Sequence, residues 1–383
     1  MSSILMALLL VVMQFVAGFG LLTLCRILLR PALFFSLSVL MGIAIFSFIP
    51  FLLELMLVPL TSLNIFLALI TSCLLLNIKI KRGWQQLKEL LGQINFNTRL
   101  YELPFFLVTG FILFVSVWRC FYLPPTSRDL TSGPEVIAEY AIREQSMINS
   151  VFSVNLETTN NQFKSTFITS LQIIYKYAGF PFGQVWLSGM VICFTVFLYH
   201  ALSQNIHRLL AGSLMVAFVA IPEMYAYTFM VLYDYSNAVY FFLACWFVSR
   251  FFKSGDQKDI AFAGLLMGIA TYIRSETLLL AGMLSIAIVW HHIRNRHKLI
   301  RLIVSGSYFL LPAVILYFLS VTLYINYYLP VRYDIGGLMN PELSNLRPLL
   351  DRFLAINSNL IFSAGGIVRY AYFIYIFLFI LIT

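Results

Sequence analysis

The sequence has little charge and few of the residues that build metal or redox centres. Only 11% of its 383 residues are charged and 61% are hydrophobic, whereas soluble domains average roughly 25% charged residues. This composition excludes a soluble globular domain, a disordered chain and a secreted disulfide scaffold. The five cysteines stand singly, without a CxxC or His-Cys pair, and so carry no signal for metal or redox chemistry. They are Cys25, Cys73, Cys120, Cys193 and Cys245.

Long apolar runs are abundant, and many approach the roughly 20 residues that cross a bilayer as a helix. They predict an all-α polytopic bundle of about eleven spans. The first should be an uncleaved span, because no basic residue precedes Ile4. The eighth and ninth are short and could be two abbreviated helices or one broken hairpin. The expected spans are 4–25, 32–58, 61–78, 104–122, 184–202, 208–230, 235–252, 259–273, 276–291, 302–326 and 361–382.

The net charge of +9 is explained by membrane topology better than by nucleic-acid binding. The basic residues lie in short loops between apolar runs and form no stripe with interleaved aromatics. With the N-terminus outside, most of them fall in cytoplasmic loops, as the positive-inside rule requires. The acids are concentrated in two long outer segments, 123–183 and 327–360. Chemistry that uses carboxylates is therefore expected outside.

Both outer segments are too long for simple connections, and such loops usually carry function. In the first, Ser132, Gly133 and Pro134 predict a helix start, with Glu135 in the first turn. This helix should lie along the membrane surface. The second should contain another amphipathic helix after Pro341. The absence of a sequence repeat weighs against a transporter built from duplicated halves.

Three acids in the first outer segment are candidate site residues. Asp129 follows a span directly, and Glu135 and Glu139 are four residues apart, which places them on one side of the expected helix. A carboxylate at that depth can act as a general base. The structural alternatives are that Glu135 only complements the helix dipole and that Glu139 only pairs with Arg143.

Charged residues at the predicted outer ends of later helices form a second candidate set, since ionisable groups at membrane depth mark functional sites by default. The alternative is that these groups reach the interface and are simply hydrated. Arg274 and Glu276 could equally cap two short helices. Arg332, in the second outer segment, is a further outer cation. The candidates in the spans are Glu223, Asp234, Arg274 and Glu276.

Four segments, in this order, resemble the GT-C superfamily of membrane glycosyltransferases, in particular its polyprenyl-phosphate-sugar-dependent branch, which includes protein O-mannosyltransferases and the aminoarabinose transferase. The first, Pro134-Glu-Val-Ile-Ala-Glu-Tyr-Ala-Ile-Arg-Glu, looks like the surface helix that carries the family's acidic motif, but position 134 is proline where the family has an acid. Asp129 is the nearest upstream aspartate. The others are Lys164 to Gly183, Leu232-Tyr-Asp-Tyr-Ser-Asn-Ala-Val-Tyr-Phe-Phe, and Gly264-Leu-Leu-Met-Gly-Ile-Ala-Thr-Tyr-Ile-Arg-Ser-Glu.

The resemblance implies an inverting transfer of a sugar from a polyprenyl-phosphate carrier to a glycan, lipid or protein acceptor at the outer face of the plasma membrane. It implies that Asp129 is the base, with Glu135 as backup base or orienting residue. The donor phosphate would meet Arg274 or Arg332. Glu139, Asp234 and Glu276 complete the expected substrate-binding set. Some family members bind a divalent cation, for which this sequence offers no convincing ligand set.

The expected organisation has three parts. An N-terminal three-span extension covers 1–103, a GT-C-like core covers 104–326 with the outer loop 123–183, and the last part, 327–383, contains the second outer loop and a final span. Two other functions fit the same residues. A transporter or flippase of a lipid-linked saccharide would use the outer charges to hold cargo, and a non-catalytic scaffold would use the outer loops to bind a partner.

Overall fold

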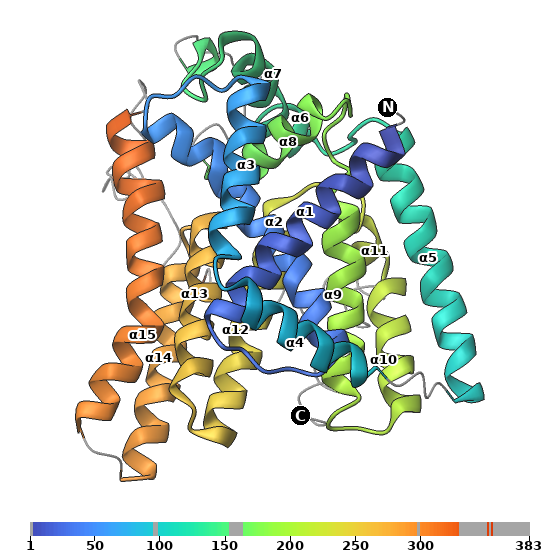
Figure 1. The fold of residues 1–383 in the computed structure, drawn as a ribbon, viewed down its shortest axis with the longest axis vertical. Coiled ribbons are helices and arrows are strands. Elements are labelled where there is room, and N and C mark those ends of the chain that lie inside the picture. Colours follow the sequence, from blue (N-terminus) through green and yellow to red (C-terminus); the bar gives the residue numbers. More distant parts are fainter. Residues whose placement is uncertain are drawn as a thin grey trace.

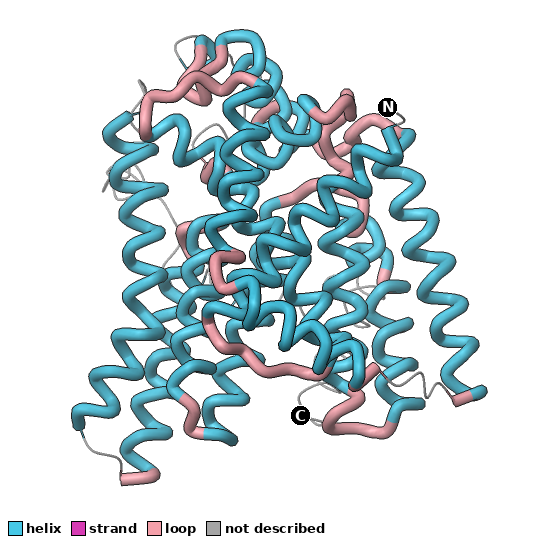
Figure 2. The backbone as a smooth tube through the Cα atoms, in the orientation of Figure 1, coloured by secondary structure: helices cyan, strands magenta, loops and turns pink. Residues whose placement is uncertain are grey.

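The structure, a computed structural model, describes residues 3–94, 99–152, 164–296 and 299–328, together with Asp351 and Leu354. These residues form helices joined by turns and loops, with no strand among them, as Figure 2 shows. The all-helical expectation is therefore confirmed for the described part of the chain. The second expected surface helix and the final span lie, apart from those two residues, outside it, and so does Arg332.

The N-terminal helices pack against each other at very short range (Figure 1). A Cβ atom on Gly18 would lie 1.7 Å from the Ser38 carbonyl oxygen, and one on Gly42 would lie 1.9 Å from the Gln14 carbonyl oxygen. Only glycine permits this backbone approach. After the third helix the chain bends by 78° into a short amphipathic helix. The four helices are α1 (Ser3–Leu24), α2 (Pro31–Leu55), α3 (Ser62–Leu76) and α4 (Ile80–Gly92).

The next apolar helix leads to a group of short helices at one end of the bundle, shown at the top of Figure 1. The helix expected from Pro134 is present, with proline in its first turn and Glu135 beside it. It packs against the buried helix that follows it in this group. The elements are η1 (Leu100–Glu102), α5 (Leu103–Tyr122), α6 (Arg128–Thr131), α7 (Pro134–Glu144), η2 (Ser150–Phe152) and α8 (Phe167–Tyr177).

The remaining helices run up and down the bundle and complete its core. The expected broken segment at 259–291 is two separate helices, joined by a short turn that contains Arg274. These elements are α9 (Trp186–Leu202), α10 (Arg208–Ala220), α11 (Pro222–Tyr227), α12 (Tyr233–Ser254), α13 (Gln257–Ile273), α14 (Thr277–Arg294), α15 (Leu299–Tyr317) and the π-helical η3 (Phe318–Tyr328).

Five helical segments among the described residues are long and apolar enough to cross a membrane, or six if the bent pair α3 and α4 counts as one. The five are Ile4–Leu24, Pro31–Leu55, Leu100–Tyr122, Thr277–Arg294 and Leu299–Ile325. The other expected spans within the described residues are helical but shorter, such as α9, α10 and α13, or carry charged residues near their ends, such as α12. By length and composition, then, several of the described helices could cross a membrane, which is consistent with a helical membrane protein.

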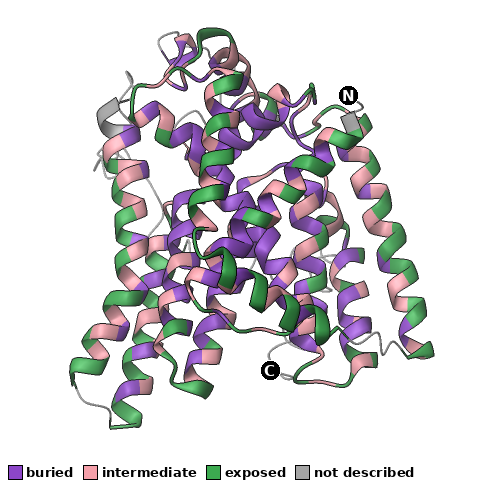
Figure 3. Ribbon diagram, in the orientation of Figure 1, coloured by how far each residue is buried: buried purple, intermediate pink, exposed green. Residues whose placement is uncertain are grey.

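The distribution of buried residues supports a membrane environment (Figure 3). One large apolar cluster contains buried residues from the first helix through η3, so the segment 1–103 contributes to the same core as the later helices. The peripheral helices leave large apolar side chains uncovered, including Phe111, Leu279 and Ile286, which are 69%, 74% and 69% exposed. Soluble monomers rarely expose continuous apolar surfaces of this kind, whereas lipid covers them.

Candidate active site

Five charged residues from four separate parts of the chain gather at the end of the bundle that carries α6, α7 and α8, and we call them the mixed-charge cluster. Three of them are carboxylates and two are cations. Each stands at or beside the end of a helix, where a charge can reach the aqueous side of a bilayer. They are Asp129 in α6, Lys164 before α8, Asp234 in the first turn of α12, Arg274 after α13 and Glu276 before α14.

Hydrogen bonds fix the chain beside Lys164 to the ends of α12 and α13. The Tyr233 hydroxyl donates to the Ser165 carbonyl oxygen over 2.9 Å, and the Ser165 hydroxyl donates to the Ile273 carbonyl oxygen over 3.2 Å. The Thr166 and Tyr272 hydroxyls lie 2.6 Å apart. Because Tyr233 adjoins Asp234 and Ile273 adjoins Arg274, these bonds hold Lys164 next to both charged residues.

Arg274 is the centre of the cluster. Its Nη1 donates to Asp234 Oδ1, and its Nε lies 3.7 Å from Glu276 Oε2. The side chains of Arg274, Asp234 and Glu276 are 31%, 54% and 72% exposed. A guanidinium with two exposed carboxylates can exchange one of them for a ligand anion, because exposed ion pairs contribute little free energy. Arg274 and Glu276 occupy the C-cap position of α13 and the N-cap position of α14, but the Glu276 side chain makes no cap hydrogen bond there.

Lys164 has an unusual electrostatic environment. Its ammonium lies 5.1 Å from the centre of the Tyr233 ring. Burial lowers the pKa of Lys164 below its ordinary value, and the Arg274 charge lowers it further, while Asp129 and Glu276 oppose the shift. Lys164 and Arg274 are thus close enough to repel each other, and the Asp129 carboxylate is close enough to Lys164 to attract it. Such perturbed groups are typical of functional sites.

Glu135 and Glu139 lie in a different group, which we call the lysine clamp. Lys176, in the last turn of α8, places its Nζ 2.6 Å from Glu135 Oε1, 2.5 Å from Glu139 Oε1 and 2.6 Å from the Pro181 carbonyl oxygen. The Lys176 side chain is 5% exposed and that of Glu135 is 15% exposed. The clamp joins α7 to α8.

Glu135 is held in place by the clamp. Burial raises the pKa of its carboxyl, and the hydrogen bond from Lys176 opposes that rise. The second oxygen, Oε2, is buried and has no hydrogen-bond partner among the residues that the structure describes. The pairing of Glu139 is with Lys176, on another helix, and no ion pair with Arg143 is among the contacts of the described residues.

Lys176 and two further residues of this end of the molecule were not among the expected site residues. Lys164 stands alone before an apolar helix, a weak signal in the sequence. Glu54, at the end of α2, accepts hydrogen bonds from Met147 N over 2.7 Å and from the Ser146 hydroxyl over 2.8 Å. It therefore ties the loop after α7 to the core. In the sequence, the only indication of this role is that Glu54 is an acid near the end of an apolar run.

One other expected residue is described, and it lies outside both groups. Glu223 is exposed in the first turn of α11. Arg332 lies outside the described residues. Within the described ranges, no three or more histidine, cysteine, aspartate or glutamate side chains are grouped closely enough to hold a metal ion. Comparisons of the chain with family models, curated proteins and solved structures find no match.

Proposed function

We propose that this chain is an integral-membrane glycosyltransferase that moves a sugar from a polyprenyl-phosphate carrier to an acceptor at the extracytoplasmic face of the plasma membrane. The observation that carries the proposal is the mixed-charge cluster, in which two cations and an accessible carboxylate share one end of an apolar helical bundle. As part of the same proposal, we infer that the chain crosses the membrane eleven times and works as the GT-C enzymes that its sequence resembles.

The two cations suit the donor phosphate. Arg274 offers a planar fork of donors, and Lys164 adds a second positive charge within electrostatic reach. When the phosphate binds, it takes the place of Asp234 or Glu276 on the guanidinium. The isoprenoid tail of the carrier is accommodated by the exposed apolar surfaces of the peripheral helices.

Asp129 suits the role of base. In the reaction the acceptor hydroxyl transfers its proton to Asp129, and the acceptor oxygen forms a bond to the anomeric carbon of the sugar. The bond from that carbon to the phosphate oxygen breaks, and the electron pair leaves with the polyprenyl phosphate, so the configuration inverts. Glu135 is the weaker candidate for the base, because one of its oxygens binds Lys176 and the other is buried.

The experiment compares transfer by membranes that contain equal amounts of wild type, Asp129→Asn and Glu223→Gln, each supplied with labelled polyprenyl-phosphate hexoses and pentoses. Glu223 is the matched control, since it is an exposed acid outside the cluster. We expect Asp129→Asn to lose a factor of about 10² to 10⁴ in transfer rate, while Glu223→Gln keeps the wild-type rate.

Two results would contradict the proposal. Full activity of Asp129→Asn would show that Asp129 is not the general base. A wild type that transfers no sugar from any of these donors, but moves lipid-linked sugar across proteoliposome membranes, would identify a flippase instead. If neither transfer nor movement occurs, the scaffold interpretation is favoured.

A further inference from the structure

Helix α4 has properties that the proposed reaction does not use. It crosses the lower half of the molecule in Figure 1, far from α6, α7 and α8 at the top. The 78° bend after α3 turns it away from the direction of that helix. From Lys79 to Gly92 the chain carries four basic residues and one acid, Glu89. A short basic amphipathic helix at such an angle to an apolar helix is typical of a helix in a membrane interface.

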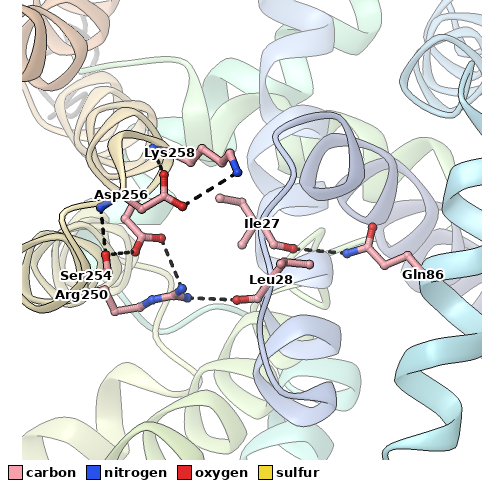
Figure 4. Close-up of polar contacts among 8 residues, drawn as sticks. Ile27, Leu28, Gln86, Arg250, Ser254, Asp256 and Lys258 are labelled. Carbon is pink, nitrogen blue, oxygen red and sulfur yellow. Dashed lines mark hydrogen bonds and ion pairs between the residues drawn. The ribbon is translucent and has the colours of Figure 1, made fainter.

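One side of α4 is fixed to the protein. Gly83 and Leu90 are buried, and a Cβ atom on Gly83 would lie 3.3 Å from Phe19 of α1. The Gln86 side chain donates to the Ile27 carbonyl oxygen over 3.2 Å. Figure 4 shows this bond on one side of the connection between α1 and α2, with Arg250 bound to the Leu28 carbonyl oxygen on the other. The orientation of α4 is thus set by the fold.

The next side of α4 is apolar and uncovered. Ile80, Trp84 and Leu91 are four and seven residues apart, so they share one side of the helix, and they are 73%, 59% and 53% exposed. Beside them is a hollow of about 150 Å³. It is lined by Phe19, Asn77, Ile80, Gly83, Trp84 and Leu87. A hollow with this mainly apolar lining fits part of an acyl chain.

The basic side borders the apolar side directly. Lys81 and Lys88 are seven residues apart, two helical turns, so they share a side, and both are exposed. The Lys88 ammonium lies 5.6 Å from the centre of the Trp84 ring. An interfacial indole flanked by two lysines combines a group that prefers the headgroup layer with charges that attract lipid phosphates.

We propose that α4 is a binding site for anionic phospholipids in the leaflet opposite the mixed-charge cluster. The lipid phosphate is bound by Lys81 and Lys88, its glycerol region lies at Trp84, and an acyl chain enters the hollow between α1 and α4. Because Gln86 connects α4 to the loop that Arg250 also holds, the bound lipid supports the packing of α1, α2 and α12.

The test measures, by native mass spectrometry, how much phosphatidylglycerol and phosphatidylcholine the purified full chain retains from mixed vesicles. We expect the wild type to retain phosphatidylglycerol preferentially. The Lys81→Gln, Lys88→Gln double variant should lose this preference by roughly tenfold. The Lys81→Arg, Lys88→Arg double variant, which keeps the charge, should behave like the wild type.

The matched control removes the same charge elsewhere. Lys253 and Lys258 are exposed at the α12–α13 corner, and Lys253→Gln with Lys258→Gln should change the preference less than threefold. Equal loss in both glutamine pairs would show a general charge effect and would overturn the proposal. Equal retention of both lipids by the wild type would overturn it as well.

Discussion

The mixed-charge cluster and the lysine clamp contain the same kinds of groups but differ in burial. In the clamp, Lys176 is 5% exposed and bound to two carboxylates and a carbonyl oxygen. In the cluster, Arg274 is 31% exposed and its acidic partners more so. Buried ion pairs are costly to break and hold elements together, whereas exposed ones exchange partners easily. The difference separates a group that positions helices from one that can receive a ligand.

The largest expected effect comes from breaking the clamp with Lys176→Met, which leaves the Glu135 carboxylate buried without its counter-charge. Removing one partner of a buried pair costs about 3 kcal/mol or more. For a chain of this size the midpoint of thermal unfolding in detergent should fall by roughly 5 °C. Arg143→Gln, an exposed cation on α7, should leave that midpoint almost unchanged. An unaltered midpoint in Lys176→Met would show that the clamp does not hold α7 on α8.

A smaller and different effect is expected when Arg274 is replaced by glutamine in the cluster. Because its ion pairs are partly exposed, the free energy of unfolding should change by less than about 1 kcal/mol. The KM for the polyprenyl-phosphate donor should rise about tenfold, since a charge-assisted hydrogen bond is lost. Arg274→Lys should give an intermediate KM because it keeps the charge without the fork. A loss of stability as large as that of Lys176→Met would remove the distinction between the two groups.

The smallest effect concerns the pH dependence of donor binding. Burial and Arg274 lower the pKa of Lys164 below its ordinary value of 10.5. As the pH rises through this lowered pKa, the lysine loses its charge and donor binding should weaken. In Lys164→Arg the side chain stays charged, so the KM should remain constant to higher pH. Superimposable KM profiles between pH 7 and 10 would show that Lys164 does not contact the donor.

Much of the helical structure was predictable from apolar run length. A helix occupies each expected apolar segment within the described residues, and α7 begins at Pro134 as expected. These features depend on neighbouring residues, which the sequence displays directly. The number of membrane crossings was harder to predict from the sequence, because α9, α10 and α13 are helices that are shorter than a typical span.

The contacts of the candidate site were only partly predictable. In the sequence, Asp234, Arg274 and Glu276 were recognisable as charges at helix ends. The sequence did not indicate that Lys164 joins them in the mixed-charge cluster. Spacing along one helix suggested Arg143 as the partner of Glu139, whereas packing of α7 on α8 brings Lys176 to it. Residues four apart are always neighbours on a helix, but pairs between helices depend on how those helices pack.

The sequence by itself determined that the described chain is helical and that several of its helices are apolar and long enough to cross a membrane. The length and polarity of each run decide locally whether a helix forms and whether it prefers lipid. Only the tertiary structure decided which charges meet and how deeply they are buried. The energy of an ion pair depends on the distance between two groups and on their access to water. For Lys164 with Arg274, and for Lys176 with Glu135, both quantities are set by segments far apart in the chain.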